Sequence, residues 1–176
     1  AGILKAWKTA GGHRKVLLSS IEEVLADRKG SLKQVRNSSN AENYQILLVE
    51  DDDGIKEMFK FFFTDWKHPI ELETADDGFD GLVKLATNVP NLLITDISMP
   101  GVNGYDMLRF LEKSKQFKDM DIMVITGLTP DKVHELGPLP KKARLFYKPL
   151  SLEKLDPMIS ELVNKSANQA ISTTIQ

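Results

Sequence analysis

The chain has no cysteine among its 176 residues, which excludes a disulfide framework and a thiolate zinc site. It lacks an apolar run near the roughly 18 residues that a membrane-spanning helix needs, and no segment has the pattern of a signal peptide. The remaining composition, 41% apolar and 27% charged, is average for one globular domain with a smaller unit attached. We therefore expect a cytoplasmic protein with no membrane partner.

The small net charge of −2 conceals an uneven distribution. Residues 1–40 hold eight Lys/Arg and three Asp/Glu, which gives a net charge of +5. The rest of the chain then holds 15 Lys/Arg and 22 Asp/Glu, which gives a net charge of −7. A basic arm on an acidic body suggests two units with different partners. On charge alone, a solvated basic surface explains the arm equally well.

Four segments can be distinguished along the chain. Residues 1–29 form the basic N-terminal unit, and residues 30–43 (GSLKQVRNSSNAEN) are polar and read as a linker. Residues 44–165 carry a regular hydrophobic pattern. Residues 166–176 (SANQAISTTIQ) are uncharged and weakly patterned, so we expect a disordered tail.

Short apolar runs alternate with helical patterns between residues 44 and 165. The runs that we interpret as strands are Ile46–Val49, Ile70–Leu72, Leu92–Ile94, Ile122–Ile125 and Leu145–Tyr147. Apolar residues at helical spacing follow each run, most clearly between Ile55 and Trp66. Five strand–helix units predict an α/β fold: a doubly wound, five-stranded parallel sheet with helices on both faces. In such sheets ligands bind at the carboxyl ends of the strands.

Polar side chains stand where the predicted strands end. Glu50 and Asp51 follow the first run, Asp96 the third, Thr126 the fourth and Lys148 the fifth. Clustered carboxylates repel one another unless a cation lies among them, and their hard oxygen atoms suit Mg²⁺. A lysine and a threonine beside that ion would bind an anionic group. The set is suited to phosphoryl transfer to a carboxylate.

Four segments, ILLVEDDDG, LLITDISMPGVNG, IMVITG and FYKPL, resemble in order and spacing the flavodoxin-like receiver domain of two-component response regulators. The resemblance covers residues 44 to about 165. It implies that Glu50 and Asp51 are the acidic pair that binds Mg²⁺ and that Asp96 is the phosphoacceptor. The backbone carbonyl of Ser98 would complete the protein's metal ligands.

The same resemblance implies roles for the remaining residues and for the partners. Thr126 would hydrogen-bond the phosphoryl group, Lys148 would pair with it, and the Lys148–Pro149 peptide would be cis. A sensor histidine kinase would donate the phosphoryl group, and a homodimer is compatible with the family. Such a domain is not an enzyme for other molecules, because it catalyses only its own phosphorylation and dephosphorylation.

Two features depart from the family pattern. Receivers usually carry Tyr or Phe three residues before the lysine, where the ring couples to the threonine, and here that position is Leu145. Pro130, Pro138 and Pro140 predict a short fourth helix with an irregular exit. Both features argue against the usual aromatic switch and the usual dimer face.

The acidic residues also allow other interpretations. Asp52 or Asp53 can simply cap the following helix. A haloacid-dehalogenase-type phosphatase needs a second Asp two positions after the first, where this chain has Ser98. A calcium loop beginning at Asp51 needs Glu at its twelfth position, which is Phe62. A glycine-rich nucleotide loop is absent from the sequence.

The N-terminal stretch AWKTAGGHRKV predicts a hairpin of residues 3–8 and 13–17, because Gly11 and Gly12 suit the turn. Ser19 and Ser20 stand three residues before two glutamates, a spacing that opens a helix ending near Arg28. A purely structural hairpin and helix explain this stretch as well.

The amino-acid sequence of this stretch also resembles the wing and the following helix of excisionase-type winged helix-turn-helix domains. This resemblance implies contacts with DNA phosphates or the minor groove by Lys8, Thr9, His13, Arg14 and Lys15. The helix-turn-helix that would precede the wing is missing, so we expect the sequence to be part of a longer protein. The alternative is an arm that docks on another protein.

Overall fold

The computed structural model describes residues 6–8, 14–16 and 43–174. Two short strands, β1 (Ala6–Lys8) and β2 (Arg14–Val16), pair in antiparallel fashion. The main body alternates strands and helices, as predicted. Its elements are β3 (Tyr44–Val49), α3 (Asp53–Thr64), β4 (Ile70–Ala75), α4 (Gly78–Thr87), β5 (Leu92–Asp96), α5 (Gly104–Lys113), the 3₁₀ turn η1 (Lys115–Phe117), β6 (Asp121–Thr126), α6 (Pro130–Leu136), β7 (Ala143–Tyr147) and α7 (Leu152–Thr174).

The five strands of the body form one parallel sheet in the order β4-β3-β5-β6-β7. The chain winds first to one side of β3 and then to the other, so β3 and β5 flank the point where the direction of winding reverses. The carboxyl ends of two such strands diverge toward different helices and leave room for a ligand between them. The predicted doubly wound fold is confirmed, and this edge is where its chemistry is expected.

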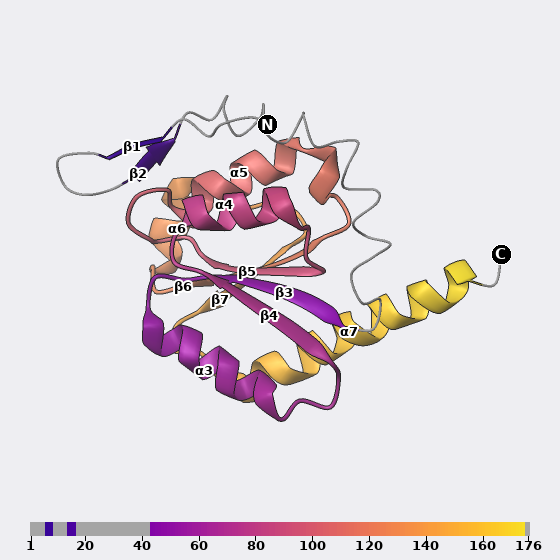
Figure 1. Cartoon of the computed structure of the whole chain (residues 1–176). Coiled ribbons are helices and arrows are strands. Elements are labelled where there is room, and N and C mark those ends of the chain that lie inside the picture. The colour runs from indigo at the N-terminus through magenta and orange to yellow at the C-terminus, as the bar shows by residue number, and fades with distance from the viewer. Residues whose placement is uncertain (1–5, 9–13, 17–42, 175–176) are drawn as a thin grey trace.

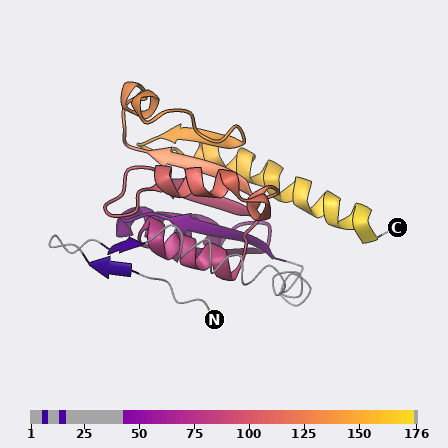
Figure 2. The ribbon, with the colours of Figure 1, turned by 90° about the horizontal axis from the view of Figure 1, so that it is seen from above.

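Helices cover the sheet on both faces, as Figures 1 and 2 show. One layer contains α4 and α5, whose Leu82, Leu85, Met107 and Leu108 are buried against the sheet, and Val133 of α6 joins the same core. The other layer contains α3 and α7, which bury Phe59, Leu155, Ile159 and Leu162 on the opposite face. Strand β5, in the middle, is buried along its whole length. Strand β4 lies at one edge of the sheet and alternates partly buried and exposed residues up to Ala75, as the alternation of Ile70 and Leu72 with glutamates in the sequence indicates.

Local signals set the helix boundaries near the carboxyl edge. The Asp52 carboxylate accepts hydrogen bonds from the backbone N–H groups of Gly54 (2.7 Å) and Ile55 (3.2 Å), and so caps α3. Helix α6 is short, as the prolines predicted. It begins at Pro130 and ends before Gly137, whose φ of 102° a glycine adopts without strain.

The amino edge of the sheet, opposite the strand-end acids, is held by neutral hydrogen bonds. Asn91 Oδ1 accepts from the Gln45 backbone N–H at 2.8 Å, and Asn88 donates to the Gln45 side chain at 2.9 Å. Nearby, Lys142 Nζ donates to the carbonyls of Phe117, Lys118 (3.3 Å) and Met120 (2.6 Å).

The C-terminal residues correct one prediction. Helix α7 continues to Thr174, where a disordered tail was expected from residue 166. The segment contains neither Gly nor Pro after Pro157, and adding residues to an existing helix costs far less than nucleating a new one. In Figures 1 and 2 the end of α7 extends past the sheet. The linker over most of residues 30–43 and the helix expected near Ser19–Arg28 lie outside the described residues. Within the described ranges, none of the helices has the length and apolarity needed to cross a bilayer.

Candidate functional site

Two buried acids lie side by side at the carboxyl edge. Glu50 directly follows β3 and is 1% exposed, and Asp96 ends β5 and is 5% exposed. The parallel register pairs Val49 with Thr95, which brings the next residue of each strand to the same level. The sheet therefore places two carboxylates at the reversal point, as predicted.

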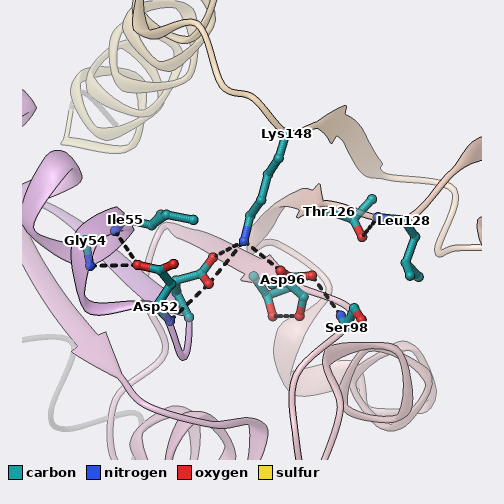
Figure 3. Close-up of polar contacts among 10 residues, drawn as sticks. Asp52, Gly54, Ile55, Asp96, Ser98, Thr126, Leu128 and Lys148 are labelled. Atoms are coloured by element: carbon teal, nitrogen blue, oxygen red, sulfur yellow. Dashed lines mark hydrogen bonds and ion pairs between the residues drawn. The ribbon is translucent and has the colours of Figure 1, made fainter.

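Lys148 bridges these two carboxylates. Its Nζ lies 2.7 Å from Asp96 Oδ2, and 2.9 and 3.1 Å from the two carboxylate oxygens of Glu50. The backbone N–H of Lys148, just after β7, donates to the carbonyl of Thr126 at the end of β6, at 2.8 Å. This bond fixes the backbone from which the Lys148 side chain extends. Figure 3 shows the side chain reaching from there to Asp96. The Lys148–Pro149 peptide is cis, as predicted.

Burial and the neighbouring charges shift the pKa values of Glu50 and Lys148. Burial raises the pKa of Glu50 above its usual value, and the hydrogen bond and charge of Lys148 only partly offset it. Burial alone would lower the pKa of Lys148, but its bonds to Asp96 and Glu50 outweigh burial and raise it. One ammonium therefore serves two buried carboxylates, and negative charge remains in excess.

Asp51 adds a third carboxylate. One oxygen each from Glu50, Asp51 and Asp96 lie within 4.8 Å of one another, and Asp51 is exposed. Three hard oxygen donors, one of them open to solvent, fit a small divalent cation such as Mg²⁺, which keeps part of its water shell. The predicted metal-binding acids are thus brought together.

The other acids of the run have separate roles. The Asp52 side chain is engaged in capping α3, as the alternative reading foresaw, while its backbone N–H donates to Glu50 at 3.2 Å. Asp53 pairs with Lys56 Nζ at 2.8 Å, and Lys56 also pairs with Asp76. Only the first two residues of the EDDD run therefore face Asp96.

Ser98 contacts the acceptor through a group that the sequence did not indicate. Its backbone N–H donates to Asp96 Oδ1 at 2.7 Å (Figure 3). Both oxygens of Asp96 are thus engaged, one by this amide and one by Lys148. The predicted role of the Ser98 carbonyl as a metal ligand stays a prediction.

Thr126 lies at the end of β6, and the described hydrogen bond of its side chain goes to its own loop. Its Oγ1 accepts from the Leu128 N–H at 3.1 Å, and no described hydrogen bond joins it to Asp96 (Figure 3). Leu145, two residues before the end of β7, packs against the core beneath α4, α5 and α6. The predicted contact between Thr126 and a phosphoryl group stays a prediction.

The predicted DNA-binding residues fall on the small hairpin or outside the described residues. Lys8 pairs in register with Arg14, and Lys15 pairs with Trp7. Thr9 and His13 lie outside the described residues. The structure therefore supports a hairpin here, and the contacts with DNA stay a prediction.

Sequence reasoning missed the contacts that hold the site together. The pairing of Lys148 with both Glu50 oxygens joins residues 98 positions apart, and no local pattern signals it. Thr95 was placed at the end of the third predicted strand together with Asp96 but was given no role, and this polar residue is fully buried beside the apolar run Leu92–Ile94. That mismatch is visible in the sequence and was a usable signal.

Known proteins resemble this chain over the same region. The family model described as the response regulator receiver domain matches residues 46–160. The transcriptional regulatory protein AfsQ1 of Streptomyces coelicolor is 32% identical over 47% of this chain and 39% of its own length. The response regulator Rre1 of Synechocystis is 27% identical over 70% of this chain and 53% of its own. The chain thus spans about half the length, or less, of these curated relatives.

Among solved structures, the chemotaxis response regulator CheY4 of Vibrio cholerae superposes with a TM-score of 0.54 at 26% identity, over 67% of this chain and 97% of that one. The family model begins at residue 46, so the resemblance of the N-terminal unit to an excisionase-type domain stays a prediction. The family model covers more than half of the sequence, and its region coincides with the parallel sheet and the strand-end acids. The chain belongs to the response regulator receiver family.

Proposed function

We propose that this chain is a phosphorylation-dependent response regulator that accepts a phosphoryl group on Asp96. The observation that carries the proposal is the buried pair of Glu50 and Asp96 bridged by Lys148, with Asp51 beside it. Receiver domains partner with sensor histidine kinases, and we propose such a kinase as the donor. A cytoplasmic location follows from that role.

In the proposed step, an Asp96 carboxylate oxygen forms a bond to phosphorus while the phosphorus–nitrogen bond of the kinase phosphohistidine breaks. The imidazole nitrogen keeps the electron pair and takes a proton from water. Lys148, already 2.7 Å from Asp96, stays as the positive charge beside the new phosphoryl oxygens. Ser98 keeps the acceptor oriented through its backbone N–H. The domain acts on no other molecule, so it is not an enzyme in the usual sense.

We propose that Glu50, Asp51 and Asp96 hold Mg²⁺, with the Ser98 carbonyl as a further ligand. When bound, the ion neutralises charge on the transferring phosphoryl group. The excess negative charge around Lys148 favours such a cation. The Thr126 hydroxyl accepts from the Leu128 amide, which leaves its O–H free to donate to a phosphoryl oxygen.

The test is labelling by acetyl phosphate with Mg²⁺, followed by intact-mass spectrometry. The wild-type chain should gain one phosphoryl group, and Asp96→Asn should gain none, because an amide oxygen is a poor nucleophile. Asp106→Asn, which removes an exposed carboxylate from the first turn of α5, is the matched control and should label normally. Full labelling of Asp96→Asn would refute the assignment.

For the output, we propose DNA binding through the N-terminal unit. The supporting observations are the β1–β2 hairpin with Lys8 opposite Arg14, and a relative named as a transcriptional regulator. Arg14→Ala should weaken binding to DNA and flatten the slope of log K against log salt by about one unit.

A gel-shift titration in low salt, with and without phosphorylation, measures both quantities. If the protein does not bind DNA in either state, the N-terminal unit is an arm that docks on another protein. Sedimentation of the same two states would test for a homodimer.

A further inference from the structure

Thr95, the residue before the acceptor, is the one buried polar side chain of β5 besides Asp96. It is fully buried. Side chains alternate along a strand, so Thr95 shares the α4–α5 face with Leu93 and Ile97, both members of that apolar core. Valine has nearly the same shape and would fill this position without a polar atom. The hydroxyl therefore needs a partner, because an unpaired buried hydroxyl is costly.

The partner is the backbone of the acceptor itself. Thr95 Oγ1 donates to the Asp96 carbonyl oxygen at 2.9 Å. This carbonyl lies at the end of β5, where the chain leaves the sheet for the loop before α5. The hydroxyl thus anchors the Asp96 peptide at the point where regular sheet bonding stops.

Gly104, the first residue of α5, closes over the same carbonyl. A Cβ atom at Gly104 would lie 1.9 Å from the Asp96 carbonyl oxygen and 2.8 Å from Thr95 Oγ1. Such distances are impossible for real atoms, so only glycine lets the helix start this close. The Asp96 carbonyl is held between a hydrogen-bond donor on one side and the backbone of α5 on the other.

We propose that Thr95 is a positioning residue for phosphorylation of Asp96. Its hydroxyl fixes the Asp96 peptide, while the Ser98 amide and Lys148 each hold one carboxylate oxygen at 2.7 Å. Three contacts then define one orientation of the nucleophile, and a well-oriented nucleophile reacts faster. The hydrogen bond of the Thr95 hydroxyl goes to the peptide carbonyl of Asp96 and not to its carboxylate, so Thr95 acts through the backbone. The inference rests on the proposed function.

The test compares Thr95→Val, which keeps the shape and loses the donor, with Thr95→Ser, which keeps the donor. Phosphorylation rates are measured over a range of acetyl phosphate concentrations, and Mg²⁺ affinity is measured by calorimetric titration. Thr95→Val should lower the maximal rate about three- to tenfold, the range expected for one hydrogen bond. The half-saturating acetyl phosphate and the Mg²⁺ dissociation constant should stay unchanged. Thr95→Ser should restore the rate to within about twofold.

Thr64→Val is the matched control, because Thr64 Oγ1 also donates to a backbone carbonyl, that of Lys60 at 2.8 Å, at the far end of α3. It should label at the wild-type rate. If Thr95→Val does not fold, as judged by thermal unfolding, Thr95→Ala against Thr95→Ser makes the same comparison.

Three results would overturn the inference: a folded Thr95→Val that reacts at the wild-type rate, a Thr95→Ser as slow as Thr95→Val, or an equal loss in Thr64→Val. A wild-type chain that takes no label would instead refute the proposed function, and this inference with it.

Discussion

Two lysines at opposite edges of the sheet show how one residue type serves two purposes. Lys142, at the amino edge, donates to three backbone carbonyls, and removal of its ammonium from water lowers its pKa. Lys148, at the carboxyl edge, faces two buried carboxylates, and its pKa is raised. Carbonyls stabilise an ammonium less than carboxylates do, so burial prevails at the first lysine and charge at the second.

The difference separates a structural edge from a reactive one. At the amino edge, the hydrogen bonds among Gln45, Asn88 and Asn91 join neutral groups, and the Glu71 carboxylate that accepts a long bond from Gln45 at 3.4 Å is exposed to water. At the carboxyl edge, three carboxylates share one described ammonium. Only the second arrangement gains by binding a further cation, which is the physical basis for expecting chemistry there.

The largest effect should come from replacing Lys148 with methionine. Lys148→Met should slow phosphorylation about 100-fold, as loss of a charge-stabilising group at a reacting centre does. It should also lower the melting temperature without Mg²⁺, because two buried carboxylates lose their partner, and Mg²⁺ should restore much of that loss.

Lys142→Met is the matched replacement at the other edge. It should label normally and lose only about 1 kcal/mol of stability, since Lys142 as a residue is exposed and its ammonium loses only bonds to neutral carbonyls. Mass spectrometry and thermal melts with and without Mg²⁺ measure both variants. Equal losses of labelling in the two would contradict the distinction between the edges.

The next effect concerns the surplus of carboxylates. Glu50→Gln combined with Asp51→Asn should weaken Mg²⁺ binding about 100-fold, because two charged ligands are lost. The fold should persist, and the metal-free melting temperature should rise, since burial already raises the pKa of Glu50 and disfavours its charged form. Calorimetric Mg²⁺ titrations and melts test this. A lower metal-free melting temperature would mean that the pairing with Lys148 outweighs the cost of burying the charge.

The smallest effect should come from a third lysine, Lys56, whose carboxylate partners are exposed. Hydrogen bonding and the charge of Lys56 lower the pKa of Asp76 below its ordinary 3.8. That pair therefore stabilises the fold above pH 3.8, and its contribution disappears as the pH falls through the lowered pKa. Asp76→Asn should cost about 0.5 kcal/mol near neutral pH, given the exposure of the pair.

Urea unfolding of the wild type and of Asp76→Asn between about pH 2 and pH 7 measures the difference between their free energies of unfolding. The two free energies of unfolding should converge at the acid end. A difference that grows on acidification would show that the charge of Asp76 is not what stabilises the pair.

The sequence was sufficient for the strands and most helices, because each apolar run ended at a polar residue and the spacing changed cleanly from strand to helix. The edge position of β4 followed from the alternation of Ile70 and Leu72 with glutamates. The candidate site followed from strand ends, since parallel strands bring their ends to one edge.

What could not be predicted depends on contacts between distant segments. The three carbonyls around Lys142 come from a turn 22 to 25 residues away, and the burial of Lys56 depends on the loop after β4. The continuation of α7 to Thr174 was missed for a different reason. Its last residues carry little pattern of their own and extend a helix nucleated by packing upstream.

The separation of Glu50 and Lys148 by 98 residues has a consequence for the newly made protein. A ribosome adds about 5–20 residues per second, so Glu50 is synthesised roughly 5–20 s before its partner. Until β7 is made, the acids at the end of β3 and β5 have no Lys148 to neutralise them. On the proposed function, a nascent chain without Lys148 should therefore accept a phosphoryl group far more slowly than the chain in which β7 and Lys148 have been made.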